Sequence, residues 1–270
     1  MIDFPSKRGV IHGSGIFPCA TLSSALLNRG PIRARDTIAQ EYPSMTDTKL
    51  FQDVVRARHS VRAFLPTVVP DALIREVLVD AQHAPSNCNA QPWVIHIVSG
   101  ARRDAISKAI LAADDAGRIT PDFPFATSNF CDAYRERTAA QGKAYYEAIG
   151  VAREDFDERR TASQLNLSFF GAPHIALLFM PVVGENEVRV AGDLGMYGQT
   201  FLLSLTAHGL GGIPQTMLGF YADTIREELG IDPSFKMLFG ISFGYPDPNS
   251  AANSYRIEKV AIEESVTFHS

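Results

Sequence analysis

The sequence is poor in cysteine and has no long apolar run, and these two absences restrict the class of protein. Its 270 residues include three cysteines, Cys19, Cys88 and Cys131, which lie far apart and form no CxxC pair. Such usage argues against a disulfide framework and fits a reducing compartment. No apolar run approaches the roughly 18 residues that a membrane helix needs. The apolar stretch 15–20 is short and broken by proline, unlike a secretory signal. We therefore expect a cytoplasmic protein that does not span a membrane.

The sequence also lacks an excess of positive charge and any metal-binding pattern. The formal net charge is −5 and the pI is about 5.8, so we expect no nucleic-acid partner and no anionic membrane surface. The histidines form no H-E-x-x-H or H-x-x-x-H pair, and we expect no metal site. A hydrophobic content of 46% is enough for a substantial core.

The chain divides by pattern into an extension and a folded part. Residues 1–44 mix glycine, proline and arginine without a helical or strand period. We expect them to be a mostly flexible extension, with an arm around a partner subunit as the alternative; Met45 is then a candidate start. Residues 45–270 are expected to form the main domain. Within it, the charged and aromatic segment 113–164 is predicted to be a lid with helices of its own.

Helices and strands alternate in the main domain. Apolar faces predict helices ending at Arg58 and running from Pro70-Asp71 to a stop before Pro85. A longer helix over 193–208 is apolar nearly all round, so it must be buried in a core or a subunit interface. Thr224 and Glu227 suggest a capping box for a short helix that ends at Gly230. Strands are predicted over 93–98, 174–180 and 237–243.

Two segments resemble known catalytic or cofactor-binding motifs, but their neighbouring residues argue against both assignments. Gly240–Gly244 matches the G-x-S-x-G nucleophile elbow, which requires a sharp turn directly into a helix. A proline-rich turn, 245–248, follows instead, and the alternation around Ser242 predicts a strand. We therefore do not expect hydrolase chemistry. Gly209–Gly212 lacks the GxGxxG spacing and the strand-to-helix context of a dinucleotide fingerprint, which argues against a Rossmann domain.

Four segments carry residue types that suit a flat, anionic ligand. Segment 58–62 places two guanidiniums and a hydroxyl at a helix end, where they suit a phosphate. Loop 84–93 fixes its backbone with two prolines and presents polar donors and acceptors. Glycines in 209–215 allow close backbone approach to a ligand, and Arg256 is a candidate phosphate anchor. Taken singly, they also read as a solvated helix end, a self-closed polar turn, a helix C-cap and a surface charge.

In this order the four segments resemble those of the bacterial nitroreductase family of FMN-dependent flavoproteins. The resemblance runs from about Leu50 to Phe268, and its marks are 58–64, 84–93, 193–195 with 209–211, and 244–248 with Arg256. It implies an α+β fold in which a central, mostly antiparallel sheet is flanked by helices. It also implies an intertwined homodimer with FMN at the interface. In two respects the chain departs from the family: Arg62 stands where many members carry lysine, and the arm before Met45 has no counterpart.

The resemblance further implies roles for single residues. The FMN phosphate would be held by Arg58, Ser60 and Arg256 with His59 beside them, and Arg62 would lie near the N1–C2 edge of the ring. The ring and ribityl chain would be contacted, across the subunit boundary, by loop residues: Pro85, Ser86, Asn87, Asn89 and Gln91. The other face of the ring would be covered by backbone that offers an amide to N5: Ile213, Pro214 and Gln215.

The implied activity is electron transfer from NADH or NADPH to nitroaromatics or related small aromatic or quinone acceptors by a ping-pong mechanism. FMN would carry the chemistry and Arg62 would stabilise charge on its reduced ring, so no catalytic nucleophile is expected. The small aromatic substrate would contact Phe125, Phe130 and Tyr134 of the lid. Two alternatives stay open: a flavin-binding or flavin-consuming protein without nicotinamide turnover, and a reductive dehalogenase of an aromatic.

Overall fold

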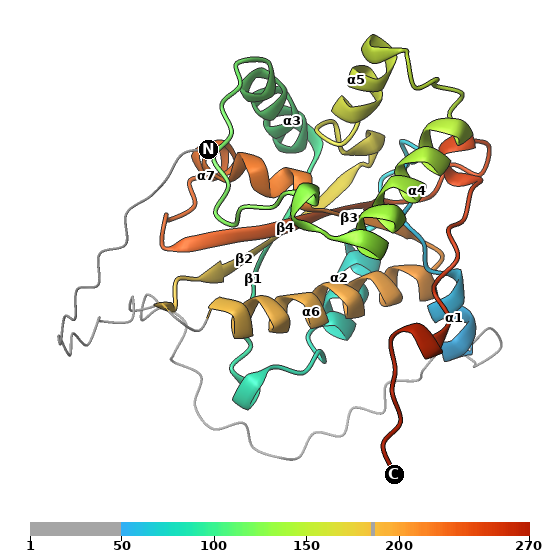
Figure 1. Cartoon of the computed structure of the whole chain (residues 1–270). Helices are drawn as coiled ribbons and strands as arrows, with labels where there is room; N and C mark the ends of the chain where they lie inside the picture. The colour runs from blue at the N-terminus through green and yellow to red at the C-terminus, as the bar shows by residue number, and fades with distance from the viewer. Residues whose placement is uncertain (1–49, 185–186) are drawn as a thin grey trace, which may run out of the picture. The chain divides into compact units, whose positions relative to one another are not determined.

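The computed structural model describes residues 50–184 and 187–270, and the expected extension 1–44 lies outside them. Within the described residues the strands form one antiparallel sheet in the order β1-β2-β4-β3 (Figure 1). The bounds are Val94–Ser99 for β1, His174–Pro181 for β2, Gly211–Gln215 for β3 and Phe235–Gly244 for β4. The central antiparallel sheet flanked by helices is confirmed, as are the three predicted strands.

Strand β3 was not predicted, because its sequence GGIPQ contains the residues that strands use least. Proline removes a ladder donor and is therefore tolerated on an edge strand. β3 is such an edge: it pairs with β4 on one side, with Pro214 opposite Ile241. Ser242 in β4 is fully buried and donates a hydrogen bond to the Gln215 side chain. It is a core strand residue, so the rejection of a nucleophile elbow is confirmed.

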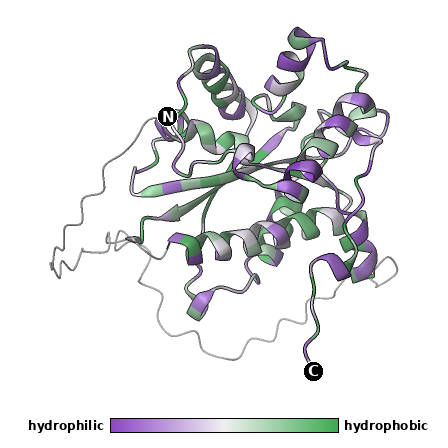
Figure 2. Ribbon diagram, viewed as in Figure 1, coloured by the Kyte–Doolittle hydropathy of each residue, from purple (hydrophilic) through white to green (hydrophobic). Residues whose placement is uncertain are grey.

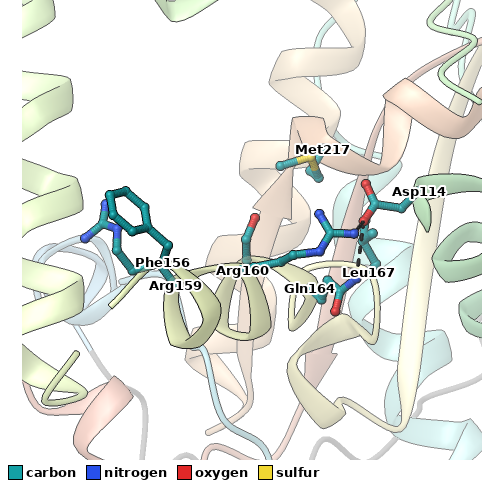
Figure 3. A pocket seen from close by; sticks show the side chains of 8 residues that line it. Asp114, Phe156, Arg159, Arg160, Gln164, Leu167 and Met217 are labelled. Atoms are coloured by element: carbon teal, nitrogen blue, oxygen red, sulfur yellow. Dashed lines mark hydrogen bonds and ion pairs between the residues drawn. The ribbon is translucent and has the colours of Figure 1, made fainter. Parts of the chain in front are cut away.

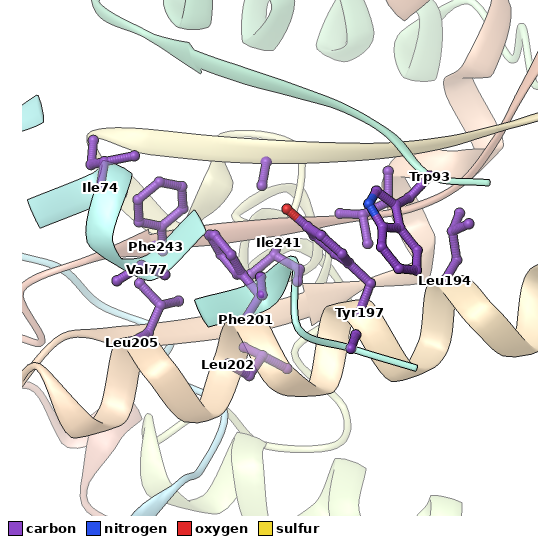
Figure 4. Close-up of a cluster of buried hydrophobic side chains, with 14 of the residues drawn as sticks. Ile74, Val77, Trp93, Leu194, Tyr197, Phe201, Leu202, Leu205, Ile241 and Phe243 are labelled. Carbon is purple, nitrogen blue, oxygen red and sulfur yellow. The ribbon is translucent and has the colours of Figure 1, made fainter. Parts of the chain in front are cut away.

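Helices cover both faces of the sheet (Figure 1). Helices α2 (Asp71–Ala81) and α6 (Glu187–Ala207) pack on one face and share a core that includes Val77, Trp93 and Phe201 (Figure 4). Helices α3 (Gly100–Asp115) and α7 (Ala222–Leu229) pack on the other face in a second cluster. The short α1 (Phe51–Ala57) also contacts α6. Short 3-10 helices lie at Asn87–Asn89, Thr127–Asn129, Phe169–Gly171, Thr216–Tyr221, Ala251–Asn253 and Ile262–Glu264.

Helix α6 begins earlier than the sequence pattern predicted, at Glu187 instead of residue 193. Gly192 is an internal helix residue with open space around it and not a break. Most of the apolar circumference is buried in the chain's own core: Leu202 is 5% exposed and Leu205 is 0% exposed. Met196, at 39% exposure, remains on the outer side. Most of the apolar surface of α6 is therefore buried within a single chain.

The predicted capping box at α7 is wrong. The helix begins at Ala222, after an N-cap residue, Tyr221, that makes no side-chain capping bond. Thr224 lies inside the first turn, and its buried hydroxyl has no hydrogen-bond partner among the described residues. The motif fails because the chain enters this helix directly from the 3-10 helix 216–221, which leaves no extended cap residue at Thr224. The predicted end is confirmed, since Gly230 adopts the left-handed conformation with φ 65°.

The segment between α3 and β2 contains two helices, α4 (Asp132–Ala148) and α5 (Phe156–Gln164). Both carry mostly hydrophilic residues, as their colouring in Figure 2 shows. Tyr145 is the buried residue of α4 and Ala162 that of α5. The expectation of helices within 113–164 is thus met, whereas their role as a lid stays a prediction. No helix in the described part of the chain is both long and apolar enough to cross a membrane.

Candidate functional site

The arginine segment 58–62 lies along the free edge of β3. Ser60 and Gly212 form a parallel bridge, and the Val61 N–H donates to the Gly212 carbonyl at 3.3 Å. This approach depends on Gly211, because a Cβ there would lie 2.5 Å from Val61 Cγ2. Val61 is 1% exposed, so it anchors the segment in the core while its neighbours remain outside. The structure therefore brings two of the four predicted segments together.

Asn253 holds the turn 245–248 and the segment of Arg256 against the arginine segment 58–62. Its Oδ1 accepts the Arg62 backbone N–H at 2.7 Å, and its Nδ2 donates to the Ala63 carbonyl at 2.8 Å and to the Asp247 carbonyl at 2.9 Å. These bonds fix the turn 245–248. They also place Arg256, which is three residues after Asn253, beside the arginine segment. The sequence pattern gave Asn253 no role. Its only signal was an amide shortly after a proline-rich turn, which is too common to be informative.

A cleft of about 640 Å³ opens where these segments meet. All five residues that the resemblance assigned to the phosphate and the ring edge line this cleft: Arg58, His59, Ser60, Arg62 and Arg256. Helix α4 contributes Gln141, and the C-terminal segment contributes Tyr255 and Glu258. The volume lies within the usual range of ligand and cofactor sites.

The cleft concentrates positive charge. The pKa of His59 is lowered by burial and further by the positive charges of Arg256, Arg58 and Arg62, against a hydrogen bond between its Nδ1 and the Ala57 carbonyl that raises it. His59 is therefore mainly neutral near pH 7. Within the described ranges, none of the three arginines lies within ion-pair distance of a carboxylate. Three guanidiniums with no described carboxylate at ion-pair distance form a site suited to a phosphate, although Glu258 lines the same cleft.

A smaller cleft of about 310 Å³ shows the contrast (Figure 3). It is lined by Arg160 and Gln164 of α5, whose donors both point at Asp114. Arg160 also pairs with Asp115 at 2.9 Å, and the Tyr221 hydroxyl donates to Asp114 at 2.7 Å. The positive charge of Arg160 is thus matched inside the protein. The second arginine that lines this cleft, Arg159, stacks on the Tyr146 ring, so the cleft does not bring several free guanidiniums together as the larger one does.

Loop 85–91 is separated from the arginine cleft within one chain. The Asn87 N–H donates to Oδ1 of Asp193 near the start of α6, whereas Gly212, the bridge partner of Ser60, packs on Leu202 and Leu205. These points are nine to twelve residues apart along α6 (202 − 193 and 205 − 193), roughly 14–18 Å at 1.5 Å per residue. The predicted loop 84–93 therefore does not join the other three segments in a single subunit.

The same loop is strained. Cys88, Asn89 and Gln91 have positive φ angles of 51°, 56° and 49°. Part of the loop closes on itself, because the Gln91 N–H donates to Ser86 Oγ at 2.9 Å and the Gln91 side chain donates to the Asn89 carbonyl. Each such conformation costs on the order of 1 kcal/mol or more for a residue other than glycine, and such costs cluster at functional sites.

The remaining predicted residues divide between core and surface. Ile213 and Gln215 are buried, and the Gln215 side chain accepts from Ser242 and donates to the Asn166 carbonyl. Only the backbone of this strand, with the exposed Pro214, is available to a ligand. The predicted substrate residues form an exposed aromatic cluster, with ring centroids 5.9 Å apart for Phe125–Phe130 and 6.4 Å for Phe130–Tyr134. They do not line the arginine cleft.

Comparison with known proteins decides the family. The model of the nitroreductase family matches residues 55–245. The chain belongs to the nitroreductase family. It is 42% identical over 226 residues to nitroreductase NfnB of Mycolicibacterium smegmatis, covering 84% of this chain and 95% of that protein. It is 34% identical over 210 residues to a 4-nitrobenzoate reductase of Pseudomonas putida, covering 77% of this chain and 91% of that protein.

A solved structure extends the similarity to the fold. The FMN-dependent nitroreductase NfnB from Mycobacterium smegmatis, solved in complex with NADPH, superposes with a TM-score of 0.78 at 43% identity. The alignment covers 81% of this chain and 97% of that one. The match to the family model ends before Arg256 and includes the arginine segment, the loop and β3.

Proposed function

We propose that the chain is an FMN-dependent nitroreductase that takes electrons from NADH or NADPH and reduces nitroaromatic compounds. The observation that carries the proposal is the cleft in which Arg58, Arg62 and Arg256 converge without a carboxylate partner among the described residues. It lies in a chain of the nitroreductase family whose relatives are described as FMN- and NADPH-dependent nitroreductases. Both the charge and the volume of the cleft fit a flavin mononucleotide.

The chain's own residues would bind and orient the cofactor. Arg58 and Arg256 would donate charge-assisted hydrogen bonds to its phosphate, with the Ser60 hydroxyl as a further donor. The neutral His59 would add no charge to the site near pH 7. Arg62 would place a positive charge at the ring edge, where it stabilises the anionic reduced form. Bound FMN supplies hydride acceptance from the nicotinamide and electron delivery to the acceptor.

We propose that the complete site forms in a homodimer. Loop 85–91 is anchored at Asp193, roughly 14–18 Å along α6 from the edge of β3 that carries Ser60. A two-fold partner would bring its own loop to the arginine cleft of the first subunit. The loop's polar groups and its strained backbone then serve the ring and ribityl chain of the neighbour's cofactor. Each of the two sites would depend on both chains.

The substrate class and the cellular location belong to the same proposal. Relatives are described as reductases of 4-nitrobenzoate, nitrobenzene and chloronitrobenzene, which supports a small nitroaromatic acceptor. We propose that the exposed Phe125, Phe130 and Tyr134 stack against it. A cytoplasmic location fits both the consumption of NAD(P)H and the unpaired, exposed Cys88 and Cys131.

The first experiment is an anaerobic titration of the purified protein. We expect yellow protein with about one FMN per subunit, bleached by NADH or NADPH and reoxidised by a nitroaromatic with ping-pong kinetics. Colourless protein that ignores added FMN would refute the proposal. Yellow protein that neither nicotinamide bleaches would be a flavin binder. Halide release from a haloaromatic without nitro reduction would identify a dehalogenase.

The second experiment separates the roles of the arginines. Arg58→Ala and Arg256→Ala should each weaken FMN binding about tenfold or more, because each removes a charge-assisted donor to the phosphate. Arg62→Ala should instead make the flavin potential more negative with a smaller loss of affinity. The matched control is Arg118→Ala, which removes an exposed arginine paired with Glu227 outside the cleft. Equal effects of all three cleft variants on affinity, with an unchanged potential, would contradict this division.

A further inference from the structure

The guanidinium of Arg62 lies against two aromatic rings. Its central carbon is 5.3 Å from the centroid of Tyr145 and 5.7 Å from that of Tyr255, and the two ring centroids are 6.2 Å apart. Both distances are within the range in which a cation is attracted to a ring face. Its one hydrogen bond within the described chain is a long contact of 3.4 Å to the Ser60 carbonyl. The two rings are therefore the main contacts that hold this side chain.

The two tyrosines come from different parts of the chain. Tyr145 lies on α4, in the segment proposed as a lid, whereas Tyr255 directly precedes the proposed phosphate ligand Arg256. Gln141, one turn before Tyr145 on the same face of α4, donates to the Tyr255 hydroxyl at 3.2 Å. Helix α4 is thus joined to the C-terminal segment at the position of Arg62.

The face of the Tyr145 ring is the part that serves Arg62. Tyr145 is 8% exposed, and its hydroxyl has no partner among the described residues. Burial raises the pKa of Tyr145, against the lowering effect of Arg62, so the phenol stays neutral near pH 7. An attraction between a neutral ring face and a cation is retained in phenylalanine and lost in leucine.

We propose that Tyr145 and Tyr255 are positioning residues that fix the Arg62 guanidinium for the flavin ring, and that α4 thereby acts on the redox potential of the cofactor. The inference rests on the proposed role of Arg62 at the ring edge. A fixed charge stabilises a developing anion more than a mobile one, because no reorganisation is needed when the anion forms. Loss of either ring should therefore weaken binding of reduced FMN more than binding of oxidised FMN.

The test compares Tyr145→Leu with Tyr145→Phe in protein reconstituted with FMN. Tyr145→Leu should make the midpoint potential more negative and weaken binding of reduced FMN by about 2- to 25-fold, the range of one cation–π contact. Tyr145→Phe should keep the wild-type values. The control Tyr146→Leu removes the neighbouring tyrosine, which packs on the Tyr145 ring at 5.3 Å and on Arg159 without contacting Arg62, and should change the potential less than Tyr145→Leu does.

A double variant decides whether the effect passes through Arg62. In an Arg62→Ala background, Tyr145→Leu should change the potential no further, because nothing remains to be positioned. A wild-type potential in Tyr145→Leu, an equal loss in Tyr145→Phe, or a full additional loss in the double variant would each overturn the inference. Tyr255→Leu and Tyr255→Phe repeat the comparison should Tyr145→Leu not fold. Wild-type protein that binds no FMN would instead refute the proposed function.

Discussion

Substituting Gly211 by alanine tests how β3 holds the arginine segment. The added Cβ would lie 2.5 Å from Val61 Cγ2, 2.8 Å from Pro246 Cγ and 3.1 Å from Val61 Cβ. Carbon atoms in good contact are about 3.5–4.0 Å apart, so about 1 Å must be gained. Neither neighbour yields easily, because valine is stiff at χ1 and the proline ring is rigid. The segment 58–62 must therefore move away from the sheet edge.

The expected cost follows from two opposing effects. Overpacking a well-packed site costs about 1–3 kcal/mol. Replacing glycine reduces the entropy of the unfolded chain and returns roughly 0.4–1 kcal/mol. We expect Gly211→Ala to lower the free energy of unfolding by about 1–2 kcal/mol. FMN binding should weaken in addition, because the already long Val61–Gly212 hydrogen bond of 3.3 Å is the ladder contact that positions Ser60.

Urea unfolding of the FMN-free protein and FMN titration of the folded protein measure the two effects. The control is Gly142→Ala on α4, where a Cβ meets nothing within 4 Å, and which should be neutral or stabilising by up to about 1 kcal/mol. Val61→Ala removes the clashing methyl groups, so the double variant Gly211→Ala, Val61→Ala should bind FMN better than Gly211→Ala alone. Wild-type stability and affinity in Gly211→Ala would refute the reasoning.

Three further predictions address stability, association and substrate choice. Burial lowers the pKa of His96 and His174, so below about pH 6.5 the unfolded chain binds more protons than the folded chain, and the free energy of unfolding decreases as the pH is lowered. The urea midpoint should therefore drop when the pH is lowered from about 7.5 to about 5.5, and the drop should be smaller in His96→Gln. Met196→Asp on the outer side of α6 should yield a folded monomer by light scattering, whereas Leu205→Asp in the core should unfold the chain. A dimeric Met196→Asp would exclude this surface of α6 from the dimer interface. Phe130→Ala should change the Michaelis constants of nitroaromatics and not FMN content; an unchanged acceptor profile would remove Phe130 from the substrate site.

Local sequence patterns predicted the elements that have a clear apolar run or an extensive apolar surface. β2 and β4 are long apolar runs and were found within two residues of their ends. α6 was recognised by its apolar residues, but its first six residues, 187–192, were missed because Gly192 resembles a helix boundary although it lies inside the helix. β3 was missed because its residues are chosen for close packing on Val61 and Leu202 and not for strand propensity. Tertiary contacts override local preference there.

The candidate site could be predicted only in part, for a related reason. The charged residues of 58–62 and Arg256 indicate an anion-binding site by their residue type alone. Tyr145, Tyr255 and Asn253 act by lying beside Arg62, and this adjacency joins positions separated by up to 193 residues (255 − 62). No period or motif in the sequence predicts such a contact. These residues are visible only once the chain is folded.

If the proposed dimer completes the site, the geometry of α6 makes FMN binding depend on association of the two subunits. The helix separates the Asp193-anchored loop from the arginine cleft, so a monomer would offer FMN the proposed phosphate ligands without the residues proposed to hold the ring. A partner chain that completes the site contributes binding free energy, and linkage requires that bound FMN strengthen the dimer by the same amount. Removing FMN should therefore raise the dissociation constant of the dimer, and Asn87→Ala should reduce this coupling without weakening the FMN-free dimer to the same degree. Sedimentation of FMN-free and FMN-bound protein measures both quantities, and a dimer constant that is independent of FMN would show that each subunit holds its cofactor alone.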